Sequence, residues 1–94
     1  MLRTIKSRSF KRFWEDDDAS GIRPDWRKRT KIILDVLQAA SRPEDVAVPG
    51  LGFHPLKGDR AGTYSVTVSR NWRITFRWDG EDAIDVELED YHDG

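Results

Sequence analysis

The sequence has 94 residues, of which 35% are charged and 37% hydrophobic, with no cysteine and a formal net charge of −1. This length predicts one domain, residues 1–94, and the lack of cysteine excludes disulfides, a thiolate nucleophile and cysteine-ligated zinc. No apolar run approaches the roughly 20 residues that cross a bilayer, and residues 1–13 lack the apolar core of a secretory signal, so we expect a cytoplasmic protein without membrane contact.

The N-terminal part of the chain predicts a short strand and a helix. Residues 2–6 are short and tolerant of β structure, and we expect them to form the first strand. Residues 7–18 have aromatic side chains at helical spacing, and Ser7 or Ser9 is available as an N-cap. A glycine and a proline within residues 19–24 then interrupt the helix.

Residues 23–40 give the strongest helical pattern. Apolar or small side chains recur at i, i+3, i+4 and i+7, and Pro24 suits the first turn. The residues of this stripe are Trp26, Thr30, Ile33, Val36, Leu37 and Ala40. The basic side chains of Arg27, Lys28 and Lys31 lie largely on the other side of the helix.

The remainder of the chain predicts a long loop followed by three strands. Residues 41–62 are rich in proline and glycine, and loops of this length often carry function. Residues 64–68, 72–78 and 83–90 alternate apolar and polar side chains, and the Asp79-Gly80 pair predicts a hairpin turn. The order β-α-α-β-β-β indicates a compact α+β domain, in which two N-terminal helices pack on a mostly antiparallel four-stranded sheet.

Charged residues are expected on the sheet face opposite the helices. If the apolar side chains of residues 72–78 pack under the helices, pleating places Arg73 and Arg77 on the other face, which must be wet or meet a partner. The alternative interpretation is cross-strand ion pairing, worth about 0.2–1 kcal/mol per pair. The acidic neighbours for such pairs are Asp85, Glu87 and Glu89.

The distribution of charge along the chain is uneven. Residues 79–94 hold eight acidic side chains and no lysine or arginine, whereas residues 1–40 hold ten basic and six acidic ones. A basic surface on one side and an acidic one on another is one interpretation, and a mixed, solvated surface is the other.

Two segments of the sequence are candidates for the halves of one site. His54 and Lys57 lie in the long loop, and Tyr91 and His92 close the last strand among carboxylates. Taken singly, His54 also fits a packed loop histidine and His92 an exposed terminal one. The residue pattern by itself does not place His92 beside Lys57.

Three motifs resemble one known family. They are "HPLKGDR" at 54–60, "NWRITF" at 71–76 and "EDYH" at 89–92, in the order and at the spacing of the HigB branch of the RelE/ParE toxins from bacterial type II toxin–antitoxin pairs. The resemblance runs from the N-terminal strand to His92. Arg70 stands where the family often has glycine, and Tyr64 where tryptophan is common.

The resemblance implies a RelE-like fold and a ribosome-dependent endonuclease that cuts messenger RNA in the A site of the small ribosomal subunit, inhibiting translation and growth. It implies the catalytic residues His54, Lys57, Arg73, Asp90, Tyr91 and His92. We further expect Arg60 and Arg77 to bind RNA phosphates or bases, and we expect neither a metal nor a cofactor.

The chemistry suits these residue types. RNA carries its own nucleophile, the 2′-hydroxyl, so the enzyme needs a base, an acid and cations. His92 is our choice as general base or acid, with His54 and Lys57 as its partners, while Arg73 binds phosphate oxygens. Tyr91 can stack on a base and Asp90 orients a neighbour; which group is the base and which the acid stays open.

The resemblance also implies partners. They are a cognate HigA-type antitoxin with a helix-turn-helix fold, the ribosome with its messenger RNA, and operator DNA through the antitoxin complex alone. We expect the antitoxin to contact the helical side, including Arg27, Lys28 and Lys31. The alternatives are a ParE-like toxin that inhibits DNA gyrase without catalysis, and a plain RNA- or partner-binding module.

Overall fold

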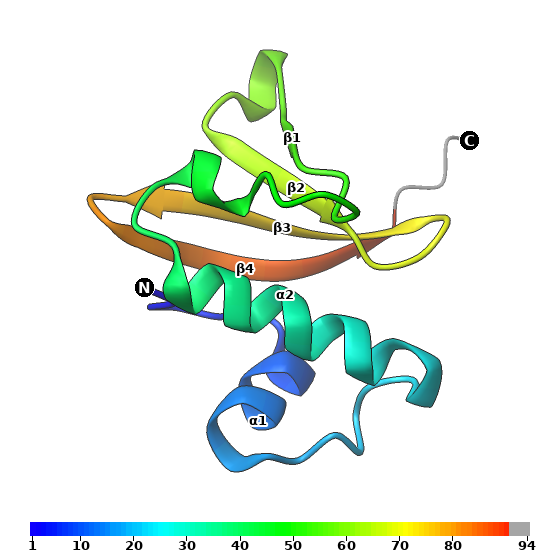
Figure 1. The fold of residues 1–94 in the computed structure, drawn as a ribbon. Coiled ribbons are helices and arrows are strands. Elements are labelled where there is room, and N and C mark those ends of the chain that lie inside the picture. Colours follow the sequence, from blue (N-terminus) through cyan, green and yellow to red (C-terminus); the bar gives the residue numbers. More distant parts are fainter. Residues whose placement is uncertain (91–94) are drawn as a thin grey trace.

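The computed structural model describes residues 1–90 and shows two helices on one side of an antiparallel sheet (Figure 1). The helices are α1 (Arg8–Asp16) and α2 (Arg27–Ala39), with 3₁₀ turns η1 (Pro24–Trp26), η2 (Pro43–Val46) and η3 (Gly58–Arg60). The strands are β1 (His54–Pro55), β2 (Thr63–Thr67), β3 (Trp72–Asp79) and β4 (Asp82–Asp90), in the order β1-β2-β3-β4. The predicted α+β class is confirmed.

Helix α1 begins where the sequence predicts. Ser7 is the N-cap, and its hydroxyl accepts a hydrogen bond from the backbone N–H of Phe10 at 3.3 Å. The helix ends at Asp16. The C-cap residue Asp17 adopts a left-handed conformation (φ 56°) and donates its N–H to the carbonyl of Arg12. Phe10 is buried and fixes α1 to the core.

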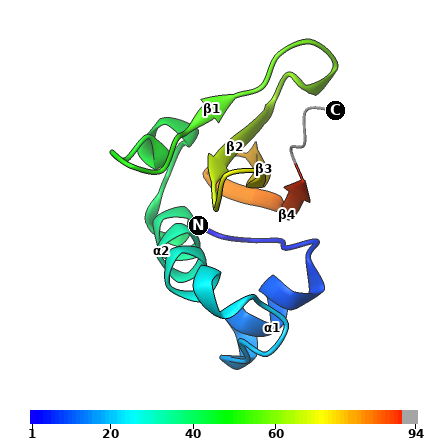
Figure 2. The ribbon, with the colours of Figure 1, turned by 90° about the vertical axis from the view of Figure 1, so that its right-hand side faces the viewer.

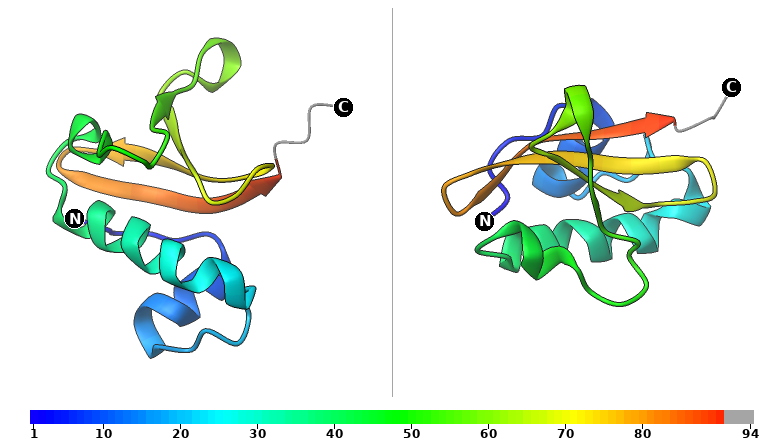
Figure 3. Two further views of the ribbon diagram at one scale, coloured as in Figure 1. Left: turned by 45° about the vertical axis from the view of Figure 1, so that its right-hand side comes forward. Right: turned by 90° about the horizontal axis from the view of Figure 1, so that it is seen from above.

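Helix α2 forms the second layer and crosses beneath the sheet (Figures 1 and 3). The predicted stripe is buried at Thr30, Ile33 and Leu37, and Leu34 joins it. Each large aliphatic side chain buried in this way contributes about 1.5–3 kcal/mol. Arg29 adds a polar tie, because its Nε donates to the carbonyl of Thr67 at 2.6 Å.

The N-terminal segment differs in detail from the strand expected at residues 2–6. It runs parallel to β4 but forms two isolated bridges, Leu2–Ala83 and Ile5–Val86, in place of a continuous ladder. The two bridges are separated by a β-bulge in β4, where the register shifts and Asp85 has a φ of 55°. The fourth strand of the sheet is instead β1, which has two residues.

The bulge can be followed from the pairing register. Thr75 pairs with Glu87 and Arg77 pairs with Ile84, so one residue of β3 faces two of β4. The extra N–H is satisfied, since Asp85 donates to the Thr4 hydroxyl at 2.8 Å. The N-terminal segment therefore stabilises the irregular edge of the sheet that it covers (Figure 2).

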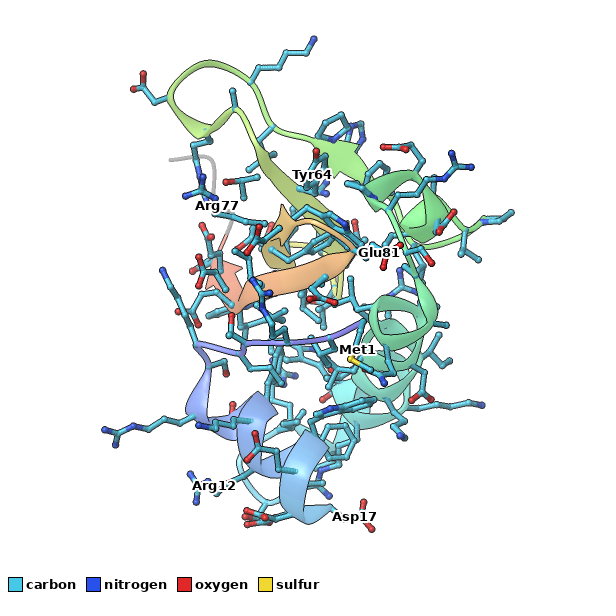
Figure 4. The ribbon with its side chains drawn as sticks, turned by 90° about the vertical axis from the view of Figure 1, so that its left-hand side faces the viewer. Met1, Arg12, Asp17, Tyr64, Arg77 and Glu81 are labelled. Atoms are coloured by element: carbon cyan, nitrogen blue, oxygen red, sulfur yellow. The ribbon has the colours of Figure 1, made fainter. Side chains whose placement is uncertain are left out.

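As expected, one face of the sheet is apolar and buried against the helices, and the opposite face carries the arginines of β3. Ile74 and Phe76 are fully buried toward the helices, and Trp72 and Trp78 pack partly buried against the same core. Arg77 is exposed and lies on the side of the sheet away from α2 (Figure 4). We call the side that carries Arg73, Thr75 and Arg77 the open face.

Within residues 1–90, no helix is both long and apolar enough to cross a membrane.

Candidate active site

The loop that carries the first motif folds into a hairpin. β1 pairs with β2 so that His54 lies opposite Ser65 and Pro55 opposite Tyr64. Proline is tolerated there because β1 is an edge strand. The ring of Phe53 stacks on Tyr64 with 5.7 Å between centroids, which fixes the base of the hairpin. The turn, including η3, stands above the sheet (Figures 1 and 3).

A first hollow, of about 320 Å³, lies between this hairpin and the open face. Its lining includes His54 and Lys57 from the hairpin and Arg73 from β3, with Ser65 of β2 between them. His54 and Lys57 are exposed. Three of the six predicted catalytic residues are thus brought together from two separate parts of the chain.

Arg73 is held by a neighbouring strand. Its Nη1 donates to the hydroxyl of Ser65 at 3.2 Å, and Ser65 itself is buried on the open face. The backbone of Arg73 pairs with Thr67 on one side and Glu89 on the other. The guanidinium is therefore directed along the sheet toward the hollow rather than into open solvent.

The last predicted residues are reached only in part. Asp90 ends β4 and pairs with Trp72, the residue that precedes Arg73. Tyr91 and His92 lie outside the described residues. The described part of β4 therefore ends beside Trp72, the neighbour of Arg73 in β3.

Glu89 forms a bidentate ion pair with Arg60 on the open face. Nη1 and Nη2 of Arg60 donate to its two carboxylate oxygens at 2.7 Å each, and the Thr75 hydroxyl donates at 2.5 Å. These hydrogen bonds hold the pKa of Glu89 below its ordinary value, with Arg60 as the main cause, while burial opposes the shift. Glu89 and Thr75 were not among the predicted site residues; the signal available was the motif "EDYH", of which Glu89 is the first residue.

Arg77 lines a second hollow on the same face, of about 390 Å³. The acidic side chains Asp85, Glu87 and Glu89 share this lining with Lys6 and Arg60. Among residues 1–90, however, Arg77 forms no ion pair or hydrogen bond through its side chain. Cross-strand ion pairing, the alternative interpretation, is therefore wrong for Arg77 among these residues. Glu89, the acid opposite Arg73, forms its ion pair with Arg60.

The sequence is similar to known proteins over almost its whole length. The family model described as "RelE-like toxin of type II toxin-antitoxin system HigB" matches residues 3–92. The chain belongs to this family. An "Endoribonuclease HigB" of Proteus vulgaris is 35% identical over 92 residues, covering 98% of this chain and 100% of the relative. "Toxin HigB-1" of Vibrio cholerae serotype O1 is 28% identical over 91 residues, covering 95% and 96%.

The resemblance drawn from the three motifs is thereby confirmed. The chain is a HigB-like toxin of a type II toxin–antitoxin system, and membership of such a system implies an antitoxin partner.

The helical side of this HigB-like toxin carries the basic residues expected to meet the antitoxin. Arg27 is partly buried, and its Nε donates to the carbonyl of Ile22 at 2.9 Å. Lys31 forms an ion pair with Asp35 at 3.0 Å and lies 4.9 Å from the ring centroid of Trp14. Lys28 is exposed. Of the three, Lys28 is the one whose charge can be changed with the smallest structural consequence.

No group of three or more histidine, aspartate or glutamate side chains is arranged to hold a metal ion in the part of the toxin that the structure describes.

Proposed function

We propose that this HigB-like toxin is an endoribonuclease that cuts messenger RNA in the A site of the ribosome, in the cytoplasm. The observation that carries the proposal is the first hollow, in which His54, Lys57 and Arg73 lie together. The name of the Proteus vulgaris relative, whose whole length the chain covers, supports the same reaction class.

The proposed reaction is attack of the RNA 2′-hydroxyl on the adjacent phosphorus. A general base removes the hydroxyl proton, the bond from phosphorus to the leaving 5′-oxygen breaks, and a general acid protonates that oxygen. His92, His54 and Lys57 supply base and acid between them, and the route needs no metal ion. Arg73 stabilises the extra negative charge that develops on the phosphate oxygens, and its planar guanidinium suits two of them.

The remaining site residues have supporting parts in the proposal. Tyr91 stacks on or hydrogen-bonds a base of the single-stranded message, and Asp90 orients a neighbouring side chain. Arg77, exposed on the open face, is a further contact for an RNA phosphate. Arg60 is already bound to the carboxylate of Glu89.

The ribosome is proposed to bind and position the message, because the toxin alone attracts RNA weakly. With a net charge of −1 the toxin attracts a polyanion weakly, so free RNA is a poor substrate. A message held in the A site meets the catalytic groups in a fixed orientation. Such orientation lowers the activation barrier of cleavage by several kcal/mol.

The antitoxin is proposed to be a helix-turn-helix protein of the HigA type. It holds the toxin inactive by binding the helical side, opposite the open face, and it brings the complex to operator DNA. The toxin alone, with nearly balanced charge, lacks the general attraction for DNA that this regulation needs.

The proposal is tested on purified ribosomes programmed with a defined message. The wild-type toxin is expected to cut the message at the A-site codon and to leave the same message intact without ribosomes. Arg73→Ala is expected to slow cleavage by about 100-fold or more with little change in melting temperature. The matched control is Arg42→Ala, an exposed arginine of the loop before η2 that pairs with Asp45, which should cut at the wild-type rate.

Three outcomes would contradict the proposal. Intact message together with inhibited DNA supercoiling would favour the ParE-like gyrase inhibitor. Intact message with no effect on supercoiling would favour a plain binding module. Rapid degradation of free RNA regardless of sequence would favour an ordinary ribonuclease.

A further inference from the structure

The ion pair between Arg60 and Glu89 joins two distant parts of the open face. Arg60 lies in η3, at the turn of the hairpin that carries His54 and Lys57, whereas Glu89 lies near the end of β4. Because η3 lies between β1 and β2, and β3 separates β2 from β4 in the sheet, the ion pair joins the β1–β2 turn to β4 across β3. The two parallel N–H···O bonds of 2.7 Å form the bidentate geometry that is strongest for an arginine and a carboxylate.

The hairpin has little else to hold its turn. Residues 57–62 are all exposed, and η3 contains no buried residue. β1 contributes two residues to the ladder, and the turn beyond it has short local hydrogen bonds, from the Arg60 N–H to the Lys57 carbonyl and from the Ala61 N–H to the Gly58 carbonyl. A bidentate tie from the turn to β4 therefore restricts the motion of the segment that positions Lys57 over the sheet.

Thr75 completes the arrangement from β3. Its hydroxyl donates to the same Glu89 oxygen, Oε2, that accepts from Arg60 Nη2, and the Thr75 side chain is buried. The carboxylate is thus fixed from both sides. We call Arg60, Glu89 and Thr75 the clamp.

The clamp also lies next to Arg73 in the sheet. Glu89 is the backbone partner of Arg73 across the β3–β4 ladder, and side chains directly opposite each other in antiparallel strands lie within contact distance. Within residues 1–90, the side chains that donate to the Glu89 carboxylate are those of Arg60 and Thr75. A Glu89 without Arg60 would leave its negative charge facing Arg73, the proposed phosphate ligand.

We infer that Glu89 and Arg60 are positioning residues for cleavage. Arg60 acts through Glu89 in two ways: it ties the hairpin that bears His54 and Lys57 to β4, and it keeps the Glu89 carboxylate away from Arg73. This inference rests on the proposed function for its effect on cleavage, whereas the tie itself is a property of the folded toxin. It assigns Arg60 a different part from the RNA contact expected from the sequence.

The test compares Arg60→Ala, Glu89→Gln and the double variant with the wild-type toxin. The first readout is amide hydrogen exchange of residues 56–62, followed by mass spectrometry at neutral pH. We expect faster exchange in this segment in both single variants, with no further increase in the double variant and unchanged protection in α2 and β3. Unchanged exchange of residues 56–62 in both single variants would overturn the inference.

The second readout is the single-turnover rate of A-site cleavage with toxin in excess. Arg60→Ala is expected to slow cleavage by about 10-fold or more, because small displacements of catalytic groups are costly. Adding Glu89→Gln is expected to restore part of the rate, since the carboxylate facing Arg73 is then neutral. If the losses of the two single variants instead multiply in the double variant, Arg60 contacts RNA directly and the inference is wrong.

A matched control separates the clamp from a general effect of charge. Glu87 lines the second hollow on the open face and has no ion pair among the described residues. Glu87→Gln in the Arg60→Ala background removes one negative charge from the same face, yet it should not restore the rate. Equal restoration by Glu87→Gln and Glu89→Gln would show general electrostatics and would contradict the inference.

The two readouts also separate this inference from the proposed function. A wild-type toxin that cuts no message on ribosomes would refute the proposed function, while hydrogen exchange would still report whether the clamp holds the hairpin. Normal cleavage with an unaffected hairpin in the variants would refute the clamp alone.

Discussion

At the scale of single residues, Glu89 is the side chain whose protonation has the clearest consequence. Its pKa is lowered below the ordinary value of 4.5, mainly by the hydrogen bonds from Arg60. A carboxyl group with a lowered pKa in the folded state stabilises the fold above its unfolded pKa. That contribution is lost as the pH falls through the folded value.

We therefore expect Glu89→Gln to lower the melting temperature by a few degrees at pH 7. The difference from the wild-type toxin should shrink as the pH falls from about 5 to below the folded pKa of Glu89, because the wild-type carboxyl then becomes neutral as well. Differential scanning calorimetry across this range measures it. A deficit that keeps the same size from pH 7 to below the folded pKa of Glu89 would show that the lost stability has another origin.

At the scale of elements, the approach of the chain to β1 depends on close packing against β2. Gly52 has a φ of 65°, and a Cβ at this position would lie 2.7 Å from the Thr67 hydroxyl oxygen. The neighbouring backbone is tied there too, since the N–H of Thr67 donates to the carbonyl of Leu51 at 2.8 Å. This contact sets the path that leads into β1 and so to His54.

The matched pair Gly52→Ala and Gly58→Ala tests this packing. Both glycines have nearly the same left-handed φ, 65° and 64°, but nothing lies within 4 Å of a Cβ at Gly58. Gly58→Ala should lower the free energy of unfolding by about 1–2 kcal/mol from backbone strain alone. Gly52→Ala should lower it by at least about 1 kcal/mol more, because overpacking is added.

Urea denaturation of the two variants measures both free energies. Equal losses would mean that Thr67 moves aside at no cost and that the loop does not depend on the close contact.

At the scale of the whole molecule, the toxin has two opposite faces. The open face with the hairpin lies on one side of the sheet, and α1 and α2 lie on the other (Figures 1 and 3). A partner that binds the helices can therefore leave the first hollow uncovered. Such an arrangement allows a toxin to be held by its antitoxin without direct contact at the site.

Lys28→Glu is expected to weaken binding of the cognate antitoxin by about 10-fold or more while leaving A-site cleavage unchanged. Lys28 is preferred to Arg27 and Lys31, because those two already serve contacts within the toxin. Arg42→Glu is the control: it reverses an exposed charge outside α1 and α2, and its ion pair with Asp45 is a surface pair of little energetic weight. Isothermal titration calorimetry measures both affinities.

If Lys28→Glu binds the antitoxin normally and His92→Ala does not, the antitoxin covers the active site instead.

The elements of the fold were largely predictable, because their signals are local. The buried stripe of α2 and the assignment of Ile74 and Arg77 to opposite faces of β3 follow from the period of the backbone. The capping by Ser7 follows from a hydroxyl beside the unpaired N–H groups at the helix start. These features depend on residues that are close together in the sequence. The three motifs likewise carried the family, which the comparison over residues 3–92 bears out.

For the candidate site, the structure brings three of the predicted residues, His54, Lys57 and Arg73, to one hollow, while their roles in catalysis stay predictions. Which acid pairs with which base depends on distances across strands that the sequence does not contain. The alternative of cross-strand ion pairing would give Glu89 to Arg73 or Arg77, yet the carboxylate binds Arg60 from the far hairpin. The reason is geometric, since the turn at η3 extends a guanidinium over the sheet.

The sequence by itself therefore determined the local features, which are the helices, the alternating strands, the cap of α1 and the family motifs. The tertiary structure alone decided that the N-terminal segment forms isolated bridges beside a bulge at Asp85. It also decided that the hairpin places His54 and Lys57 at one hollow with Arg73. Both results depend on contacts between residues far apart in the chain, and such contacts are set by the packing of complete elements rather than by the pattern within any one of them.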